Sequence, residues 1–228
     1  MRLAIIPARG GSKRIPKKNI KLFHGQPIIS YSIETIKRSE LFEKIIVSTD
    51  DSEIADVAVQ YGAEIPFLRP KEISDDLSPT NDVIVHAINH FQDKGYELER
   101  VCCVYPTAPF LQSGDLKAAS ALITDSTQLV FSATEFSYPI FRSFRVFNDN
   151  KVEMFWPDNF SKRSQDLEKA YHDAGMFYYG KPEFFLQNEV FFNQYAKAYL
   201  MPHYRVQDID TMDDWYRAEK YFKLLKAD

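Results

Sequence analysis

Segments with the pattern of strands and of helices alternate through the first half of this chain of 228 residues. Short apolar runs rich in β-branched residues are followed by longer segments whose apolar residues recur at helical spacing. The predicted strands are 3–6, 44–49, 63–67 and 100–105, and the predicted helices are 27–37, 52–61, 81–91 and 113–123. This alternation is typical of a mainly parallel sheet with helices on both faces. We therefore predict an α/β, Rossmann-like fold of three layers.

The pattern changes after about residue 129. Short alternating runs with many aromatic residues occupy 130–133, 141–147, 152–155 and 176–179. We predict a small antiparallel section inserted at approximately residues 134–180, within a single domain that spans 1–228. Its aromatic residues form its own core, a subunit interface of a homodimer, or both. A last helix is predicted at 212–225.

The composition indicates the solubility and the cellular compartment of the protein. No apolar run approaches the length of a membrane span, and the run at the start is too short for a signal peptide. Cys102 and Cys103 are neighbours in a predicted strand, where they point to opposite faces and do not favour a disulfide with each other. We expect a soluble, cytoplasmic protein with no membrane partner.

Charge is distributed unevenly along the chain. The net charge is −4, yet the first 33 residues contain no Asp or Glu and carry seven Lys or Arg. This indicates an anion site, and the alternative is a solvated basic face. The rest of the chain is net acidic and has no second basic stripe to follow a phosphate backbone, so we do not expect a nucleic acid partner.

A loop with two glycines and five cations follows the first predicted strand, the position at which open α/β sheets bind ligands. Gly10 and Gly11 let the backbone approach an anion and direct N–H groups toward it. The loop matches neither the P-loop nor the dinucleotide-binding glycine motif, which argues against a P-loop NTPase or a dehydrogenase. We predict a triphosphate cradle, and the alternative is a mobile surface turn. The cradle residues are Ala8, Arg9, Gly10, Gly11, Ser12 and Lys13.

Residues 5–20 resemble the N-terminal signature of the acylneuraminate cytidylyltransferases, in the order Ile-Ile-Pro-Ala-Arg-Gly-Gly-Ser-Lys-Arg-Ile-Pro-Lys-Lys-Asn-Ile. The resemblance implies that Arg9 and Lys13 hold the phosphates of CTP and that Asn19 helps to recognise the nucleotide. It also implies that Arg69 and Thr80, in a second similar stretch, face the cytidine. From the residues alone, Asn19 and Thr80 are candidates for caps, and Arg69 is a surface residue.

Two further stretches are similar to the pseudaminic acid branch of this family. Residues 105–110 replace a Gln-Pro-Thr-Ser-Pro-Leu-like run of the sialic acid synthetases, and 160–179 contain the segments Arg-Ser-Gln-Asp and His-Asp-Ala-Gly. The resemblance implies transfer of CMP from CTP to the anomeric hydroxyl of a nine-carbon acidic sugar, with pseudaminic acid favoured over sialic or legionaminic acid. The predicted sugar-binding residues are Tyr105, Thr107, Arg163, Gln165, His172 and Tyr178.

Two of these residues have specific expected roles. Arg163 can clamp the sugar carboxylate, and Tyr178 can stack on the sugar ring. A lone histidine such as His172 is more often structural than catalytic.

Asp208 and Asp210 stand two positions apart just before the last predicted helix. On a strand they would share one face, and Mg²⁺ commonly takes one or two carboxylates together with waters and phosphates. We predict that both bind Mg²⁺, and the alternative is that Asp210 or Thr211 caps the helix. The predicted catalytic residues are Arg9, Lys13, Asp208 and Asp210. Rival functions are another sugar nucleotidyltransferase, acting with a different nucleotide or an eight-carbon acid, and a non-catalytic nucleotide-binding module.

Overall fold

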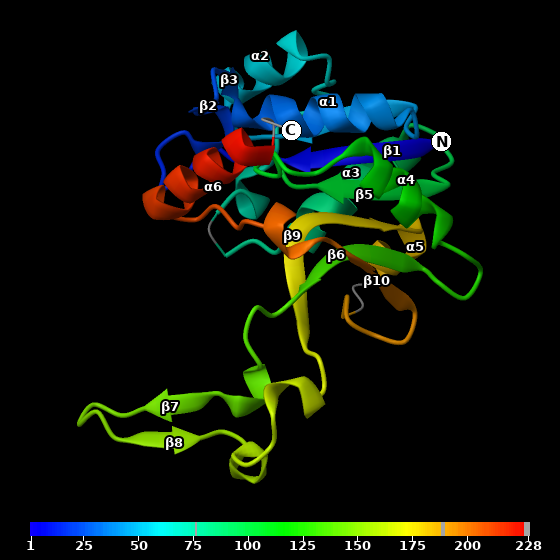
Figure 1. The fold of residues 1–228 in the computed structure, drawn as a ribbon. Coiled ribbons are helices and arrows are strands. Elements are labelled where there is room, and N and C mark those ends of the chain that lie inside the picture. The colour runs from blue at the N-terminus through cyan, green and yellow to red at the C-terminus, as the bar shows by residue number, and fades with distance from the viewer. Residues whose placement is uncertain (76, 188–189, 226–228) are drawn as a thin grey trace.

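A six-stranded sheet runs through the body of the molecule in the computed structural model, which describes residues 1–75, 77–187 and 190–225 (Figure 1). From one edge to the other, its strands are β10 (Ala196–Leu200), β6 (Leu129–Glu135), β9 (Tyr171–Gly180), β5 (Arg100–Val104), β1 (Arg2–Pro7) and β4 (Lys44–Ser48). Neighbouring strands are parallel except at β9, which is antiparallel to both β5 and β6. The mainly parallel sheet predicted from the sequence is therefore confirmed.

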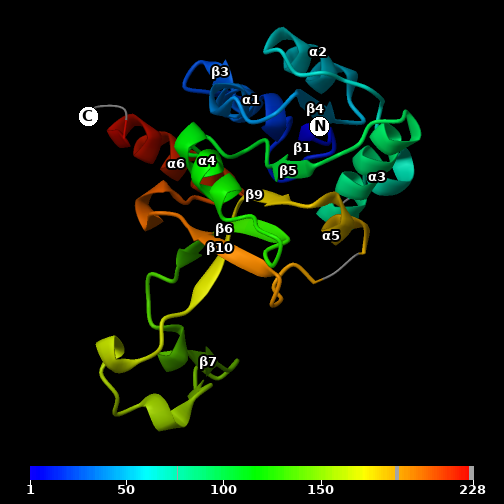
Figure 2. The ribbon, with the colours of Figure 1, turned by 90° about the vertical axis from the view of Figure 1, so that its right-hand side faces the viewer.

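Helices cover both faces of this sheet (Figure 1, Figure 2). They are α1 (Ile28–Ser39), α2 (Ser52–Gln60), α3 (Thr80–Asp93), α4 (Ser113–Ala121), α5 (Pro182–Leu186) and α6 (Met212–Leu225). Buried residues of α1, α2, α4 and α6 pack against one face, and those of α3 and α5 pack against the other. The predicted three layers are confirmed. Within the described residues, no helix is both long enough and apolar enough to cross a membrane.

The two cores explain why the central strands are continuously apolar. In β1, Ala4 and Ile6 point into one core, whereas Leu3 and Ile5 point into the other. Side chains of a strand alternate between faces, so a strand covered on both sides needs apolar residues at every position. Cys102 and Cys103 follow the same rule, since they enter opposite cores as free, buried thiols.

Some predicted elements differ from the observed ones. Residues 63–67 do not form a strand and contribute one isolated bridge, between Ile46 and Glu64. The hairpin of β2 (Leu22–Phe23) and β3 (Gln26–Pro27) and the edge strand β10 were not predicted. The hairpin strands are two residues long, too short for a periodic pattern to be recognised.

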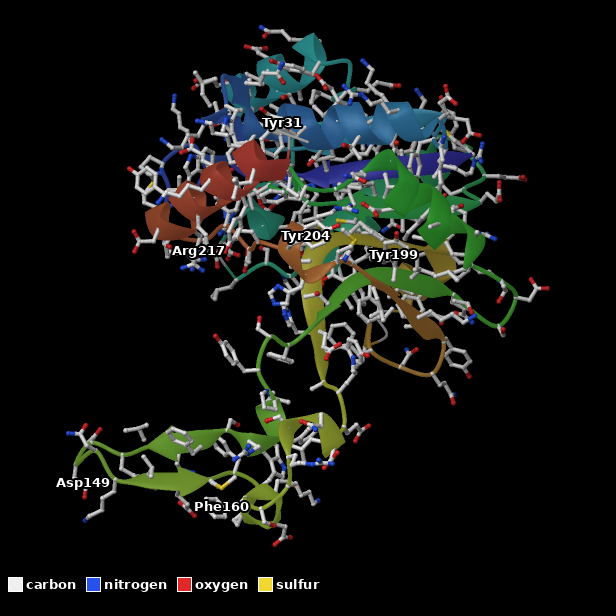
Figure 3. All side chains as sticks on the ribbon, in the orientation of Figure 1. Tyr31, Asp149, Phe160, Tyr199, Tyr204 and Arg217 are labelled. Atoms are coloured by element: carbon white, nitrogen blue, oxygen red, sulfur yellow. The ribbon has the colours of Figure 1, made fainter. Side chains whose placement is uncertain are left out.

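Part of the predicted insertion forms an arm that projects from the body (Figure 1, Figure 2). The arm, residues 136–170, contains an antiparallel hairpin of β7 (Phe144–Val146) and β8 (Val152–Met154). In contrast, 171–180 form β9 within the central sheet, so the projecting part is shorter than the predicted range of 134–180. Figure 3 shows Phe160 and Asp149 on the arm, away from the body.

Many aromatic side chains of the arm face solvent. The exposed ones are Phe136, Tyr138, Phe144, Phe147, Phe155, Trp156 and Phe160. A few pair with each other, as Phe141 does with Trp156 at 5.3 Å between ring centres. The arm of a single chain therefore does not bury its own apolar surface, which favours the interface interpretation of these residues over the core interpretation.

Candidate active site

A cleft of about 480 Å³ lies beyond the carboxyl ends of β1 and β5. Its walls come from three segments, 7–19, 69–83 and 105–107, together with Asp210 from the C-terminal part of the chain. The predicted site residues that line it are Arg9, Ser12, Lys13, Asn19, Arg69, Thr80, Tyr105, Thr107 and Asp210. Open α/β sheets bind ligands at this edge, and the volume lies within the range of small-molecule sites.

The basic loop is fixed by hydrogen bonds to its neighbours. The Asn19 side-chain amide donates to the carbonyl oxygen of Arg9 at 2.9 Å, and the Arg9 guanidinium donates to the carbonyl oxygen of Asp75 at 2.6 Å. The observed role of Asn19 is thus to hold the shape of the loop, although it also lines the cleft. Ala8 is completely buried, and its N–H bonds to the carbonyl of Ser48.

The two glycines of the loop differ from each other. The Gly10 N–H donates to the Asp50 carboxylate at 2.9 Å, so the anion at which it points in this structure belongs to the protein itself. A side chain at Gly10 would place its Cβ 2.5 Å from the Asp51 carboxylate, and this contact explains why glycine is needed there. A Cβ at Gly11 would meet no atom within 4 Å, so Gly11 is the position at which the loop stays open to a ligand.

Arg69 is buried at the base of the cleft. Its guanidinium donates to both the hydroxyl and the carbonyl oxygen of Ser48, which ends β4. Burial lowers the pKa of Arg69 to about 10, with the Asp50 carboxylate opposing that change and the charge of Arg9 adding to it. Arg69 therefore remains a cation at neutral pH. The interpretation of Arg69 as a surface residue is wrong.

Thr80 is the first residue of α3, and the N-cap position before it is taken by Pro79. Its hydroxyl instead bonds to the Tyr105 hydroxyl at 2.9 Å across the cleft wall. The interpretation of Thr80 as a cap is wrong. Burial raises the pKa of Tyr105 to about 12, so this phenol stays protonated at neutral pH.

The predicted stacking of Tyr178 on a sugar ring is also wrong for this structure. Its ring is buried, at 4.8 Å from the ring centre of Phe191 and 6.0 Å from that of Tyr105. The planes of the paired rings are inclined at 64° and 68°. Since Tyr178 is 8% exposed, its ring has no open face for a ligand.

The acidic segment is not the strand that we predicted. Residues 206–210 have no regular structure and follow a turn of 3₁₀ helix at His203–Arg205. The segment is anchored by a buried ion pair between Arg205 and Asp115 of α4, and Arg205 also donates to the carbonyl oxygen of Phe110 at 3.2 Å. Since the anchor lies just before the segment, the backbone path of 206–210 is set by α4 rather than by a sheet.

Asp210 brings this segment to the basic loop. Its carboxylate is 3.0 Å from Arg14 and 3.4 Å from Lys18, and Lys18 also donates to the carbonyl of Ile209 at 2.6 Å. Opposite charges from the two ends of the chain therefore meet at one cleft. Arg14 and Lys18 are two of the five cations counted in the loop, although neither was among the predicted nucleotide-binding residues.

Asp208 lies beside this ion-pair cluster, although it does not line the cleft itself. Its pKa is raised, first because the surrounding protein removes part of its hydration and next because Asp210 carries a like charge, while Lys18 opposes the rise. The described residues contain no group of three or more His, Cys, Asp or Glu side chains that could hold a metal. Two carboxylates beside a basic loop fit Mg²⁺, which would take its other ligands from phosphates and water.

The first turn of α6 has its own cap, which leaves Asp210 available. The Thr211 N–H donates to the Asp214 carboxylate at 2.9 Å, and the Asp214 N–H donates back to the Thr211 hydroxyl at 3.3 Å. This reciprocal pair is a capping box. The cap interpretation therefore holds for Thr211 and not for the Asp210 side chain.

The remaining predicted sugar residues lie away from the cleft. Arg163 and Gln165 are exposed on the arm, where Arg163 pairs with Asp166 at 2.8 Å. His172 packs on Phe136 at the base of the arm, with a ring nitrogen 2.8 Å from the Asp173 carbonyl oxygen. None of these three residues lines the cleft, and the arm projects away from the body (Figure 1).

Comparisons with known proteins agree with the fold. The family model described as cytidylyltransferase matches residues 3–224. The chain is 45% identical to a pseudaminic acid cytidylyltransferase of Campylobacter jejuni, across 97% of this chain and 96% of that protein. It is 33% identical to a CMP-N,N'-diacetyllegionaminic acid synthase of Legionella pneumophila, with the same coverage of each chain.

A solved structure shares the fold at low sequence identity. The CMP:2-keto-3-deoxy-manno-octonic acid synthetase complexed with CTP superposes with a TM-score of 0.71 at 14% identity, over 98% of each chain. This likeness supports the architecture alone. The family model covers nearly all of the chain, and with it the basic loop, the cleft and the acidic segment, so this chain belongs to the cytidylyltransferase family.

Proposed function

We propose that this chain transfers CMP from CTP to the anomeric hydroxyl of pseudaminic acid and releases pyrophosphate. The observation that carries the proposal is the meeting of the basic loop with Asp210 in one cleft, because a triphosphate with its metal needs both signs of charge. The choice of sugar rests on the 45% identity to the Campylobacter jejuni pseudaminic acid cytidylyltransferase.

In the proposed reaction the sugar oxygen attacks the α-phosphorus of CTP in line with the leaving group. The new bond joins that oxygen to phosphorus, the bond from phosphorus to the bridging oxygen of pyrophosphate breaks, and the hydroxyl proton passes to water. Arg9 and Lys13 bind the β- and γ-phosphates and stabilise the negative charge that develops on pyrophosphate. No covalent bond to the enzyme is needed, since positioning and charge stabilisation suffice.

Asp208 and Asp210 would hold Mg²⁺, which neutralises phosphate charge when it is bound. In the structure the Asp210 carboxylate pairs with Arg14 and Lys18. With Mg²⁺ held by Asp210, those two cations would be available to the phosphates.

Pyrophosphate release tests this proposal. The chain is supplied with CTP, Mg²⁺ and, in parallel, pseudaminic, legionaminic, N-acetylneuraminic or 2-keto-3-deoxy-manno-octonic acid. We expect the highest kcat/KM with pseudaminic acid. A higher kcat/KM with another sugar would refute the sugar assignment and leave the proposed type of reaction unchanged. Binding of CTP without release of pyrophosphate from any sugar would favour the non-catalytic binding module.

The proposed assembly is a homodimer built through the arm. The aromatic surface of the arm is exposed in the single chain, and Arg163 and Gln165 lie on it, away from their own cleft. A second copy of the chain would cover this surface. Arg163 could then enter the cleft of that second copy and bind the sugar carboxylate there. A cytoplasmic location is part of the proposal, and the free thiols of Cys102 and Cys103 fit a reducing compartment.

The double variant Phe144→Ser/Phe160→Ser should weaken dimerisation. Both side chains are more than half exposed on the arm, and removing aromatic anchors from an interface raises its dissociation constant by about ten-fold or more. Sedimentation over a concentration series measures this change. Leu224→Ser on α6, also more than half exposed, is the control and should leave the dimer intact. A monomeric unmodified chain at all concentrations would contradict the proposal.

A further inference from the structure

A buried carboxylate lies at the start of the acidic segment. Asp115 of α4 accepts hydrogen bonds from three parts of the chain. The donors are the Gln112 N–H at 2.8 Å, the Tyr199 hydroxyl of β10 at 3.0 Å and the Arg205 guanidinium. Tyr199 bonds to one carboxylate oxygen, and the other two donors share the second. Both oxygens are therefore engaged, and the orientation of the carboxylate is fixed.

Arg205 connects this carboxylate to the cleft. Its guanidinium donates to Asp115 and also to the carbonyl oxygen of Phe110 at 3.2 Å. Phe110 ends the loop after β5, and residues 105–107 of that loop line the cleft. The side chains of Arg205 and Asp115 are only 10% and 5% exposed. One buried guanidinium thus joins α4, the cleft loop and the acidic segment.

The ion pair itself is informative, because burying two charges is an inefficient way to stabilise a fold. The loss of hydration offsets the attraction between the charges, and apolar side chains of similar volume often give equal stability. A charged hydrogen bond does supply geometry, since it fixes both side chains relative to each other. The pair stands three positions before Asp208, so this geometry acts on the backbone that carries the acidic residues.

The two carboxylates of the acidic segment depend on different anchors. Asp208 lies between two fixed points of the chain, Arg205 and Ile209, and Ile209 is buried in the core. Asp210 follows Ile209 directly, and its N–H donates to the Asp214 carboxylate of α6 at 3.3 Å. Loss of the Arg205 anchor would release the backbone on one side of Asp208, whereas Asp210 would keep its connection to α6.

We infer that Arg205 and Asp115 are positioning residues for Mg²⁺ binding and act on it through Asp208. This inference rests on the proposed function, in which Asp208 and Asp210 hold Mg²⁺ beside the phosphates of CTP. Arg205 and Asp115 bind neither the metal nor the nucleotide themselves. Buried partners that hold a metal ligand in place are typically worth about 10–100-fold in affinity for the metal.

The strengthening of CTP binding by Mg²⁺ measures this effect without sugar and without turnover. Titration calorimetry gives the dissociation constant of CTP in the presence of EDTA and in the presence of Mg²⁺. We call the ratio of the first constant to the second the Mg²⁺ enhancement. For the unmodified chain we expect Mg²⁺ to tighten the binding of CTP, so the enhancement is greater than one.

The double variant Asp115→Asn/Arg205→Met removes the ion pair without leaving a single buried charge. Asparagine keeps an acceptor for the Gln112 N–H, and methionine fills much of the volume of arginine, so the variant is expected to fold. The Mg²⁺ enhancement should fall by about 10–100-fold, or to one if it is smaller than that. CTP binding in EDTA should stay the same, because the basic loop is unchanged.

A milder variant serves as a second test of the network. Tyr199→Phe removes one donor to Asp115 and leaves the ion pair in place. It should lower the Mg²⁺ enhancement by a smaller factor than the double variant, again with no change of CTP binding in EDTA. Thermal unfolding of each variant confirms that it is folded.

Addition of Asp208→Asn tests the route from the ion pair to the metal. Asp208→Asn alone should lower the Mg²⁺ enhancement. Added to the double variant, it should lower the enhancement little further, because residues that act through one another have effects that do not add.

The matched control is an ion pair at the other end of β1. Arg2 and Glu43 lie 3.1 Å apart at the amino end of this strand, away from the cleft. The variant Arg2→Met/Glu43→Gln makes the same two kinds of change there. It should leave the Mg²⁺ enhancement unchanged.

Each contrary result has a distinct meaning. Equal loss of CTP affinity in EDTA and in Mg²⁺, in the double variant and in Tyr199→Phe, would reduce the network to packing and overturn the inference. An unchanged enhancement in both variants would overturn it as well. A full further loss on adding Asp208→Asn would exclude the route through Asp208. An unmodified chain that does not bind CTP would overturn the proposed function itself, before any variant is compared.

Discussion

Replacing Lys13 by alanine should lower the turnover of pyrophosphate release by about 10²–10³-fold, the loss seen when one preorganised donor to a developing charge is removed. Lys13 lies in the wall of the cleft, on the loop that faces Asp210. The negative charge on pyrophosphate grows as its bond to the α-phosphorus breaks, so a cation held there stabilises the transition state more than bound CTP. Steady-state measurement of kcat and KM with CTP tests this.

The division between kcat and KM identifies the role of Lys13. A loss mainly in kcat places its action in the transition state, whereas a loss mainly in KM would make it a binding residue only. Lys117→Ala on α4 removes a lysine from an exposed position and should leave both constants unchanged. Unchanged turnover in Lys13→Ala would remove this residue from the mechanism.

The sequence predicts best those parts of the site that follow directly from local pattern. The run from Leu3 to Ile6 is apolar at every position because both faces of β1 are covered, and this pattern placed the basic loop at the correct edge of the sheet. The same reasoning could have identified Asp50, which follows the predicted strand 44–49 at that edge and accepts the N–H of Gly10.

Other parts of the site depend on contacts that no local pattern records. Arg205 and Asp115 are 90 positions apart in the sequence, yet their ion pair anchors the acidic segment. β9 lies between β5 and β6 although the 35 residues of the arm (136–170) separate it from β6 in the sequence. Pairing between distant strands has no signature in either strand alone, which explains why Tyr178 was predicted to face the sugar.

The second large effect is expected at Asp210. Asp210→Asn keeps the shape of the side chain and removes the charge, which weakens Mg²⁺ binding because Mg²⁺ prefers carboxylate oxygens. A bound metal contributes several kcal/mol of charge stabilisation, so turnover at a fixed, limiting Mg²⁺ concentration should fall by about 10²-fold or more. Titration of activity with Mg²⁺ should show partial recovery at high metal concentration. Asp213→Asn, an exposed carboxylate in the first turn of α6, is the matched control.

The pH dependence of the Mg²⁺ titration separates a metal ligand from a residue that only pairs with Arg14 and Lys18. The raised pKa of Asp208 means that protons compete with the metal at a higher pH than for an ordinary aspartate, so the Mg²⁺ requirement of the unmodified chain should rise as the solution is acidified. Asp210→Asn removes the like charge and lowers the pKa of Asp208, which shifts this rise to lower pH. At high pH, where protons no longer compete with the metal, an identical Mg²⁺ requirement in Asp210→Asn and the unmodified chain would exclude Asp210 as a ligand, because its charge would then act only on Asp208 and the basic loop.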